Sequence, residues 1–130
     1  MPETIVITDT SVMVNFLALD RVELLARLPD FRFAVTDHVR AEVTAHYKDQ
    51  LHRLEKAFAE GILQEISVTA PEEVELFATL TATGLGVGEC SAIAVASHRK
   101  LPLAIDDKRA IKKLTKHNID LTIYTTESLV

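Results

Sequence analysis

The chain has 130 residues, of which 48% are hydrophobic and 25% charged, and its formal net charge is -5. This composition is ordinary for a soluble globular protein, and the length suits one domain with its own core. No apolar run approaches the roughly 18 residues of a membrane span, no signal-peptide pattern opens the chain, and the lone Cys90 excludes an internal disulfide framework, so a cytoplasmic protein without a membrane partner is expected.

The first half of the chain alternates β-branched runs with amphipathic segments. In chain order, the pattern predicts a strand at residues 4–8, a helix at 12–28 broken near 19–20, a strand at 31–35 and a long helix at 38–60. Thr36 and Asp37 are suitable capping residues for the long helix, and Gly61 is a suitable residue to end it.

The second half continues the alternation. It predicts an extended segment at residues 62–68, helices at 71–83 and 89–99, a strand at 101–105, a helix at 108–117 and a final strand at 121–124. Strands that alternate with helices indicate an α/β domain, in which a central parallel sheet is flanked by helices.

Acidic residues recur where the expected strands end and the expected helices begin. Asp9 follows the first strand, Asp106 and Asp107 follow the strand at 101–105, and Glu89 opens a helix. Glu42 lies early in the long helix and could reach the same rim. Because ligands of open α/β sheets collect at the carboxyl ends of strands, these acids are expected to converge there. Carboxylates without His or Cys companions select Mg²⁺ or Mn²⁺, which favours hydrolysis of a phosphodiester.

Each acid also has an ordinary structural explanation. Asp9 is of the type and position of a helix N-cap, Glu89 suits the positive end of a helix dipole, and Glu42 suits a solvated helix face. The Asp106 and Asp107 pair could cap the helix that follows it. Spacing alone leaves both interpretations open and favours the structural one.

The helix expected at residues 108–117 is strongly basic. Its basic side chains, with no acid among them, are Lys108, Arg109, Lys112, Lys113 and Lys116. Because the run starts beside Asp107, we expect Lys108, Arg109 and Lys112 to steer nucleic-acid phosphates towards the acids. A solvated helix face is the alternative, and both can hold together.

Other polar and aromatic residues give weaker signals. His38 precedes Glu42 by one helical turn and could approach the acids, although a capping or surface role is favoured. The aromatic residues, including Tyr47 and Tyr124, are scattered, so no base-stacking platform is expected.

Four short motifs, taken in order, resemble those of the PIN-domain family. They are residues 7–12 (ITDTSV), 39–43 (VRAEV), 85–93 (LGVGECSAI) and 103–110 (LAIDDKRA). One branch of that family has glutamate in the third motif, where aspartate is commoner, and Glu89 matches that branch. The ordered set covers nearly the whole chain.

The resemblance implies one PIN-like domain with endoribonuclease activity that depends on Mg²⁺ or Mn²⁺. The catalytic and metal-binding residues that it implies are Asp9, Glu42, Glu89 and either Asp106 or Asp107. Ser11 would orient a carboxylate or a water molecule. It further implies an RNA substrate, a homodimer and, for a VapC-type toxin, an antitoxin protein as partner.

Two other functions remain as alternatives. One is a catalytically silent PIN-like module that binds RNA or a protein. The other is a receiver domain of the response-regulator type, which also gathers aspartates at strand ends. The receiver domain is disfavoured because Asp106 and Asp107 come late in the chain and no third-strand phosphoacceptor is present.

Overall fold

A computed structural model of the chain describes residues 4–19, 21–28 and 30–129. The strands in these ranges are all parallel and form one sheet in the order β3-β2-β1-β4-β5. Their bounds are Thr4–Thr8 (β1), Phe31–Thr36 (β2), Leu63–Ile66 (β3), Leu103–Ala104 (β4) and Ile123–Tyr124 (β5). The predicted α/β fold with a central parallel sheet is confirmed, and β1 is its middle strand.

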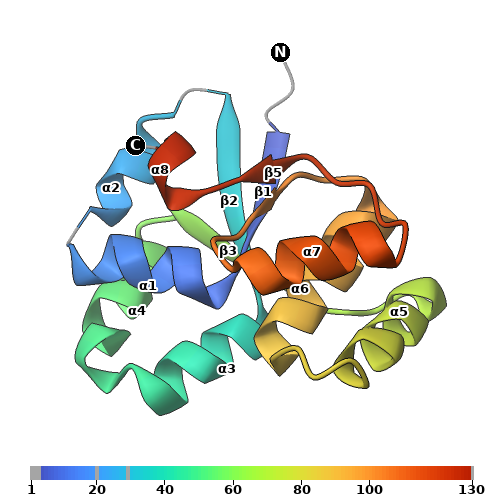
Figure 1. The fold of residues 1–130 in the computed structure, drawn as a ribbon. Coiled ribbons are helices and arrows are strands. Elements are labelled where there is room, and N and C mark those ends of the chain that lie inside the picture. Colours follow the sequence, from blue (N-terminus) through green and yellow to red (C-terminus); the bar gives the residue numbers. More distant parts are fainter. Residues whose placement is uncertain (1–3, 20, 29, 130) are drawn as a thin grey trace.

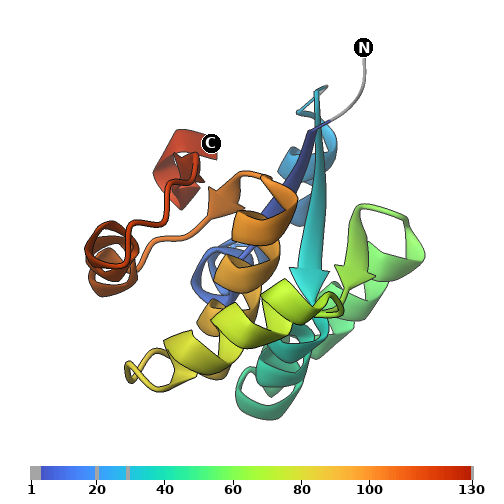
Figure 2. The same cartoon turned by 90° about the vertical axis from the view of Figure 1, so that its right-hand side faces the viewer.

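Helices connect the strands and flank the sheet (Figure 1). Their bounds are Thr10–Ala18 (α1), Val22–Ala26 (α2), Asp37–His46 (α3), Lys48–Gln50 (the 3-10 helix η1), Leu51–Ala59 (α4), Pro71–Thr81 (α5), Val87–Arg99 (α6), Lys108–Lys116 (α7) and Thr126–Leu129 (α8). Figure 2 shows α7 and α8 on one side of the molecule and β3 with α4 on the other, as the sheet order requires. Within the described ranges, no helix is long and apolar enough to cross a membrane.

A hydrophobic layer covers each face of the sheet because side chains alternate along its strands. Val6 of β1 and Phe33 of β2 pack in the layer that contains α1, α2 and α4. Their neighbours Ile7 and Ala34 pack in the opposite layer, with α5, α6 and α7. The middle of the sheet is therefore buried on both faces. Asp9, the residue that follows β1, lies at the edge of this buried region.

The uninterrupted helix predicted over residues 38–60 is wrong. The chain instead forms α3, η1 and α4, with the break at Tyr47, whose backbone is not helical (φ -129°, ψ 55°). The break turns α4 so that Arg53 donates to the carbonyl of Leu17, at the end of α1 (2.7 Å). The break is thus associated with a contact between segments far apart in sequence, which amphipathic periodicity does not report.

The other elements differ from prediction mainly at their ends. The helix predicted over residues 12–28 begins earlier and is two helices, α1 and α2; residue 20 of its predicted break lies outside the described ranges. α6 begins at Val87 rather than Glu89, with Gly86 as its N-cap. β3, β4 and β5 are shorter than the segments predicted for them, and α8 was not predicted.

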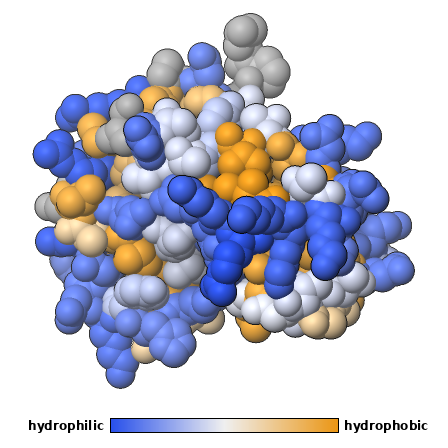
Figure 3. All heavy atoms as spheres, in the orientation of Figure 1, coloured by the Kyte–Doolittle hydropathy of each residue, from blue (hydrophilic) through white to orange (hydrophobic). Residues whose placement is uncertain are grey.

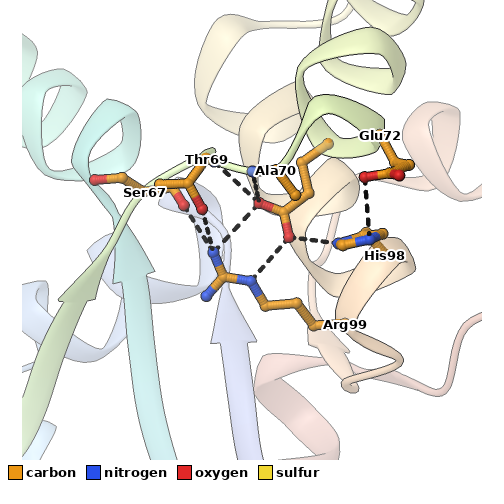
Figure 4. Close-up of polar contacts among 7 residues, drawn as sticks. Ser67, Thr69, Ala70, Glu72, His98 and Arg99 are labelled. Atoms are coloured by element: carbon orange, nitrogen blue, oxygen red, sulfur yellow. Dashed lines mark hydrogen bonds and ion pairs between the residues drawn. The ribbon is translucent and has the colours of Figure 1, made fainter.

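A buried carboxylate ties α5 to the end of α6. The Glu73 side chain is 1% exposed. One oxygen accepts from Arg99 Nε (2.9 Å) and lies 2.7 Å from His98 Nδ1, and the other accepts from the backbone N–H groups of Thr69 and Ala70 (Figure 4). Burial alone would raise the pKa of Glu73, but the hydrogen bonds from Arg99, Thr69 and His98 outweigh it and lower the pKa to about 2.

Replacing Glu73 by glutamine is expected to lower the free energy of unfolding by roughly 2 kcal/mol at pH 7, because Arg99 loses a charged partner. A depressed pKa contributes stability that is present above pH 4.5, the ordinary value, and is lost as the pH falls towards 2. The difference between wild type and Glu73→Gln in urea unfolding should therefore shrink between pH 5 and pH 3. A difference that stays constant over this range would contradict the assigned ion pair.

Candidate functional site

A pocket opens at the carboxyl end of β1, where four helices begin or pass. Figure 1 shows the first turns of α1, α3, α6 and α7 near this end of the strand. The residues that line the pocket are Asp9, Thr10, Ser11, Glu42, Tyr47, Glu89 and Asp107. The structure therefore brings together most of the acids that the sequence analysis singled out.

Asp9 is the most buried acid of the pocket, at 1% exposure. It caps α1: its Oδ2 accepts from the Ser11 hydroxyl (3.0 Å) and from the Ser11 N–H (3.4 Å). Its Oδ1 is buried and has no hydrogen-bond partner among the described residues. Burial raises the pKa of Asp9 to about 6, and the nearby charge of Glu42 also raises it. The hydrogen bonds from Ser11 and Thr10 lower this pKa but do not outweigh burial.

Glu42 is held in place by two neighbours that the sequence analysis did not name. The Thr10 hydroxyl donates to Glu42 Oε2 (3.0 Å). Gly88 leaves room for the carboxylate, because a Cβ at that position would overlap it. The hydroxyl pair after Asp9 and the glycines before Glu89 are the sequence signals that could have pointed to these roles.

Glu89 and Asp107 share the other side of the pocket. Burial raises the pKa of Glu89 to about 8, with contributions from a hydrogen bond to Asp107 and from the Asp9 charge. Burial would also raise the pKa of Asp107, but hydrogen bonds from Glu89, Arg109 N–H and Ala110 N–H outweigh it and lower the pKa.

Asp106 and Asp107, which the sequence left as alternatives, have different surroundings. Asp107 lines the pocket. Asp106 is not among the lining residues: it accepts from the N–H (2.8 Å) and the hydroxyl (2.6 Å) of Thr126 and from Asn15 Nδ2 (2.9 Å). Asp106 thus joins the start of α8 to α1, and the fourth acid of the pocket is Asp107.

The pocket has the donor set of a site for a hard cation. Carboxylate and hydroxyl oxygens line it, and no basic side chain does so among the described residues. The buried Oδ1 of Asp9 and Oε2 of Glu89 have no partner within the same ranges, and buried polar atoms of this kind call for an explanation such as an ion. In residues 4–19, 21–28 and 30–129, no three His, Cys, Asp or Glu side chains are gathered around one point as a ready metal site. The fit therefore rests on the unpartnered oxygens and the donor chemistry.

The basic residues lie beside the pocket rather than in it. Lys108, Arg109 and Lys112 are exposed on α7, which starts directly after Asp107. Figure 3 shows a strongly hydrophilic band across the face that α7 occupies in Figure 1. Lys113 is not free, since its ammonium group donates to the carbonyl of Thr83.

His38 does not line the pocket. Its ring packs against Phe77 of α5, with 4.9 Å between ring centroids, and its Nδ1 lies 3.1 Å from Asp37 Oδ1. His38 is half-buried between α3 and α5 and is not the cap of α3, which is Thr36, so its favoured capping or surface role is not what the structure shows.

Comparison with protein families assigns the chain to a known group. Residues 5–123 match the family model DUF3368, described as a PIN domain. The chain belongs to the PIN-domain family. PIN domains are in general nucleases, and family membership removes the receiver-domain alternative.

Solved structures share this PIN fold at low sequence identity. A PilT N-terminus domain protein from Sulfolobus solfataricus P2 is 18% identical, with a TM-score of 0.64 over 97% of this chain and 90% of that one. VapBC2 from Rickettsia felis, bound to a DNA fragment from its promoter, is 19% identical, with a TM-score of 0.63 over 94% and 98%. A toxin-antitoxin complex from Klebsiella pneumoniae is 16% identical, with a TM-score of 0.57 over 82% and 89%. No curated protein sequence matches the chain.

Placing alanine at Gly88 is expected to displace Glu42 and to destabilise the PIN domain by roughly 1–3 kcal/mol through overpacking. Gly86→Ala is the matched control, because a Cβ there meets its nearest atom, Glu89 Oε1, at 3.4 Å. Urea unfolding of both variants, and of Gly88→Ala combined with Glu42→Ala, measures the effect. The Glu42→Ala background should relieve the Gly88→Ala penalty, and an unrelieved penalty would show that Gly88 acts through another neighbour.

Proposed function

We propose that this PIN domain is an endoribonuclease that depends on Mg²⁺ or Mn²⁺. The observation that carries the proposal is the pair of buried, unpartnered carboxylate oxygens, Asp9 Oδ1 and Glu89 Oε2, in one acid-lined pocket. Leaving such atoms without a partner costs roughly 1–3 kcal/mol each. A protein that only needed a stable fold would gain by replacing them, so their presence supports a role as ligands.

The residues that would hold the cation are Asp9, Glu42, Glu89 and Asp107. When bound, a divalent cation would neutralise these carboxylates, polarise a phosphoryl oxygen and lower the pKa of an attacking water. The Ser11 hydroxyl fixes the rotamer of Asp9, and the Thr10 hydroxyl does the same for Glu42. Pre-positioned carboxylates of this kind need little rearrangement when the substrate arrives.

An RNA substrate suits the charge distribution better than the net charge of -5 suggests. Lys108, Arg109 and Lys112 form an exposed positive face on α7 that begins at the acidic pocket. Phosphates attracted to this face would be led to the carboxylates and their cation. The acids account for the net charge, and α7 accounts for attraction of the substrate.

The direct test is cleavage of a single-stranded RNA by the purified protein with Mn²⁺, followed by excess chelator. Asp9→Asn is expected to reduce the rate by at least about 100-fold, because it removes a charged ligand from the middle of the site. Asp107→Asn should have a similar effect, whereas its neighbour Asp106→Asn should retain activity in protein that remains folded by circular dichroism. Thermal unfolding should show that Mn²⁺ raises the Tm of wild type and not that of Asp9→Asn.

Cleavage that survives both Asp9→Asn and chelator would overturn the proposed site. RNA binding without any cleavage, in protein whose Tm does not respond to Mn²⁺ or Mg²⁺, would favour the alternative of a catalytically silent PIN-like module.

We further propose that the physiological partner is an antitoxin protein. The supporting observation is the likeness to solved VapBC and toxin-antitoxin assemblies. A short reading frame for a DNA-binding protein should lie next to the gene, and its co-expressed product should form a complex with this chain and suppress cleavage. A neighbouring protein that binds without lowering the cleavage rate would contradict this partner. The homodimer and the cytoplasmic location remain predictions. Light scattering of the purified protein tests the homodimer.

A further inference from the structure

An aromatic side chain lies at the break between α3 and η1. Tyr47 is 41% exposed and lines the same pocket as Asp9, Glu42 and Glu89. It is the one aromatic residue among those that line the pocket in the described part of the chain. Its position depends on the break that amphipathic periodicity did not predict, because an uninterrupted helix would give Tyr47 a different direction.

The polar and aromatic contacts of the fold do not involve the Tyr47 side chain among the described residues. The Tyr47 backbone is satisfied, since its N–H donates to the Val43 carbonyl (2.9 Å) and its carbonyl accepts from Gln50 N–H (2.9 Å). In the described ranges, the ring takes part in no aromatic pair and the hydroxyl in no hydrogen bond. Tyr124, by contrast, packs its ring edge-on against Phe31, with 5.5 Å between the centroids. The exposed part of this ring, at the rim of the acidic pocket, is available to a ligand.

We propose that Tyr47 stacks on a base of the RNA strand whose phosphate is engaged at the acidic pocket. This proposal rests on the ribonuclease function proposed above. A single RNA strand offers phosphates and flat bases side by side, and α7 with the acids accounts only for the phosphates. The other side of the pocket, at the end of α3, supplies the flat apolar surface that a base requires.

The charge of the protein strengthens this assignment. With a net charge of -5, phosphate attraction is limited and weakens further as salt increases. Stacking on an aromatic face depends little on salt and tolerates any base, because every base has a π-face. Tyr47 would thus hold the strand in register without reading its sequence.

The test measures binding of a short single-stranded phosphorothioate RNA, which resists hydrolysis and keeps its charge, to the protein with Mn²⁺, with and without one substitution. Tyr47→Leu should weaken binding roughly 5- to 150-fold, the range for loss of one stacked base, and Tyr47→Phe should stay within about twofold because stacking needs only the ring. Lys112→Gln is the matched control: it should reduce the slope of affinity against salt, which Tyr47→Leu should leave unchanged. Val74→Ala, at an exposed apolar residue outside the pocket lining, should change neither.

A set of RNAs that each lack one base separates stacking from a merely structural role. One of these RNAs, which lacks the stacked base, should bind more weakly to protein that retains Tyr47. For that RNA, Tyr47→Leu should cause no further loss of affinity. Equal binding of Tyr47→Leu and its parent to every intact RNA would overturn the stacking proposal and leave the ribonuclease proposal standing. Wild-type protein that neither binds nor cleaves RNA would overturn both.

Discussion

Burial of a carboxylate at the end of the central strand is the constraint around which this PIN domain is arranged. Asp9 follows β1, which has a neighbouring strand on each side and a hydrophobic layer on each face. Water is excluded there, and the cost of charging Asp9 appears as a raised pKa. The surrounding elements bring further acidic side chains to this point and, among the described residues, no basic ones to the pocket lining. The free-energy cost of charging Asp9 is therefore not offset by a basic side chain.

Helix starts offset part of that cost. Asp9 caps α1, Asp107 caps α7, and Glu89 lies in the first turn of α6, where backbone N–H groups and the helix dipole favour negative charge. The capping roles of Asp9 and Asp107 are therefore confirmed, and they are compatible with the proposed role of these acids as ligands of a cation. Capping gives the carboxyl groups of Asp9 and Asp107 a fixed direction, which favours binding of a cation.

The sequence predicts the order and type of nearly all elements, because hydrophobic periodicity reports on local burial. It does not decide features that depend on distant contacts. The break at Tyr47 is accompanied by a contact of Arg53 with the distant Leu17 carbonyl, and a Cβ at Gly88 would overlap the side chain of Glu42. The choice between Asp106 and Asp107 depends on their partners, since both follow the end of β4. Asp107 caps α7, whereas Asp106 accepts from Thr126 and Asn15, which are distant in the sequence.

The two groups of buried acids in this chain are treated in opposite ways. Glu73 is surrounded by the donors of Arg99 and His98 and has a pKa of about 2. Asp9 and Glu89 retain unpartnered oxygens and have raised pKa values. The chain has 14 Lys and Arg residues, and the described ones stay out of the pocket lining. Where a carboxylate serves only the fold, a basic side chain neutralises it. At the end of β1 no described basic side chain lines the pocket beside Asp9 and Glu89, and this difference is what supports the proposed cation site.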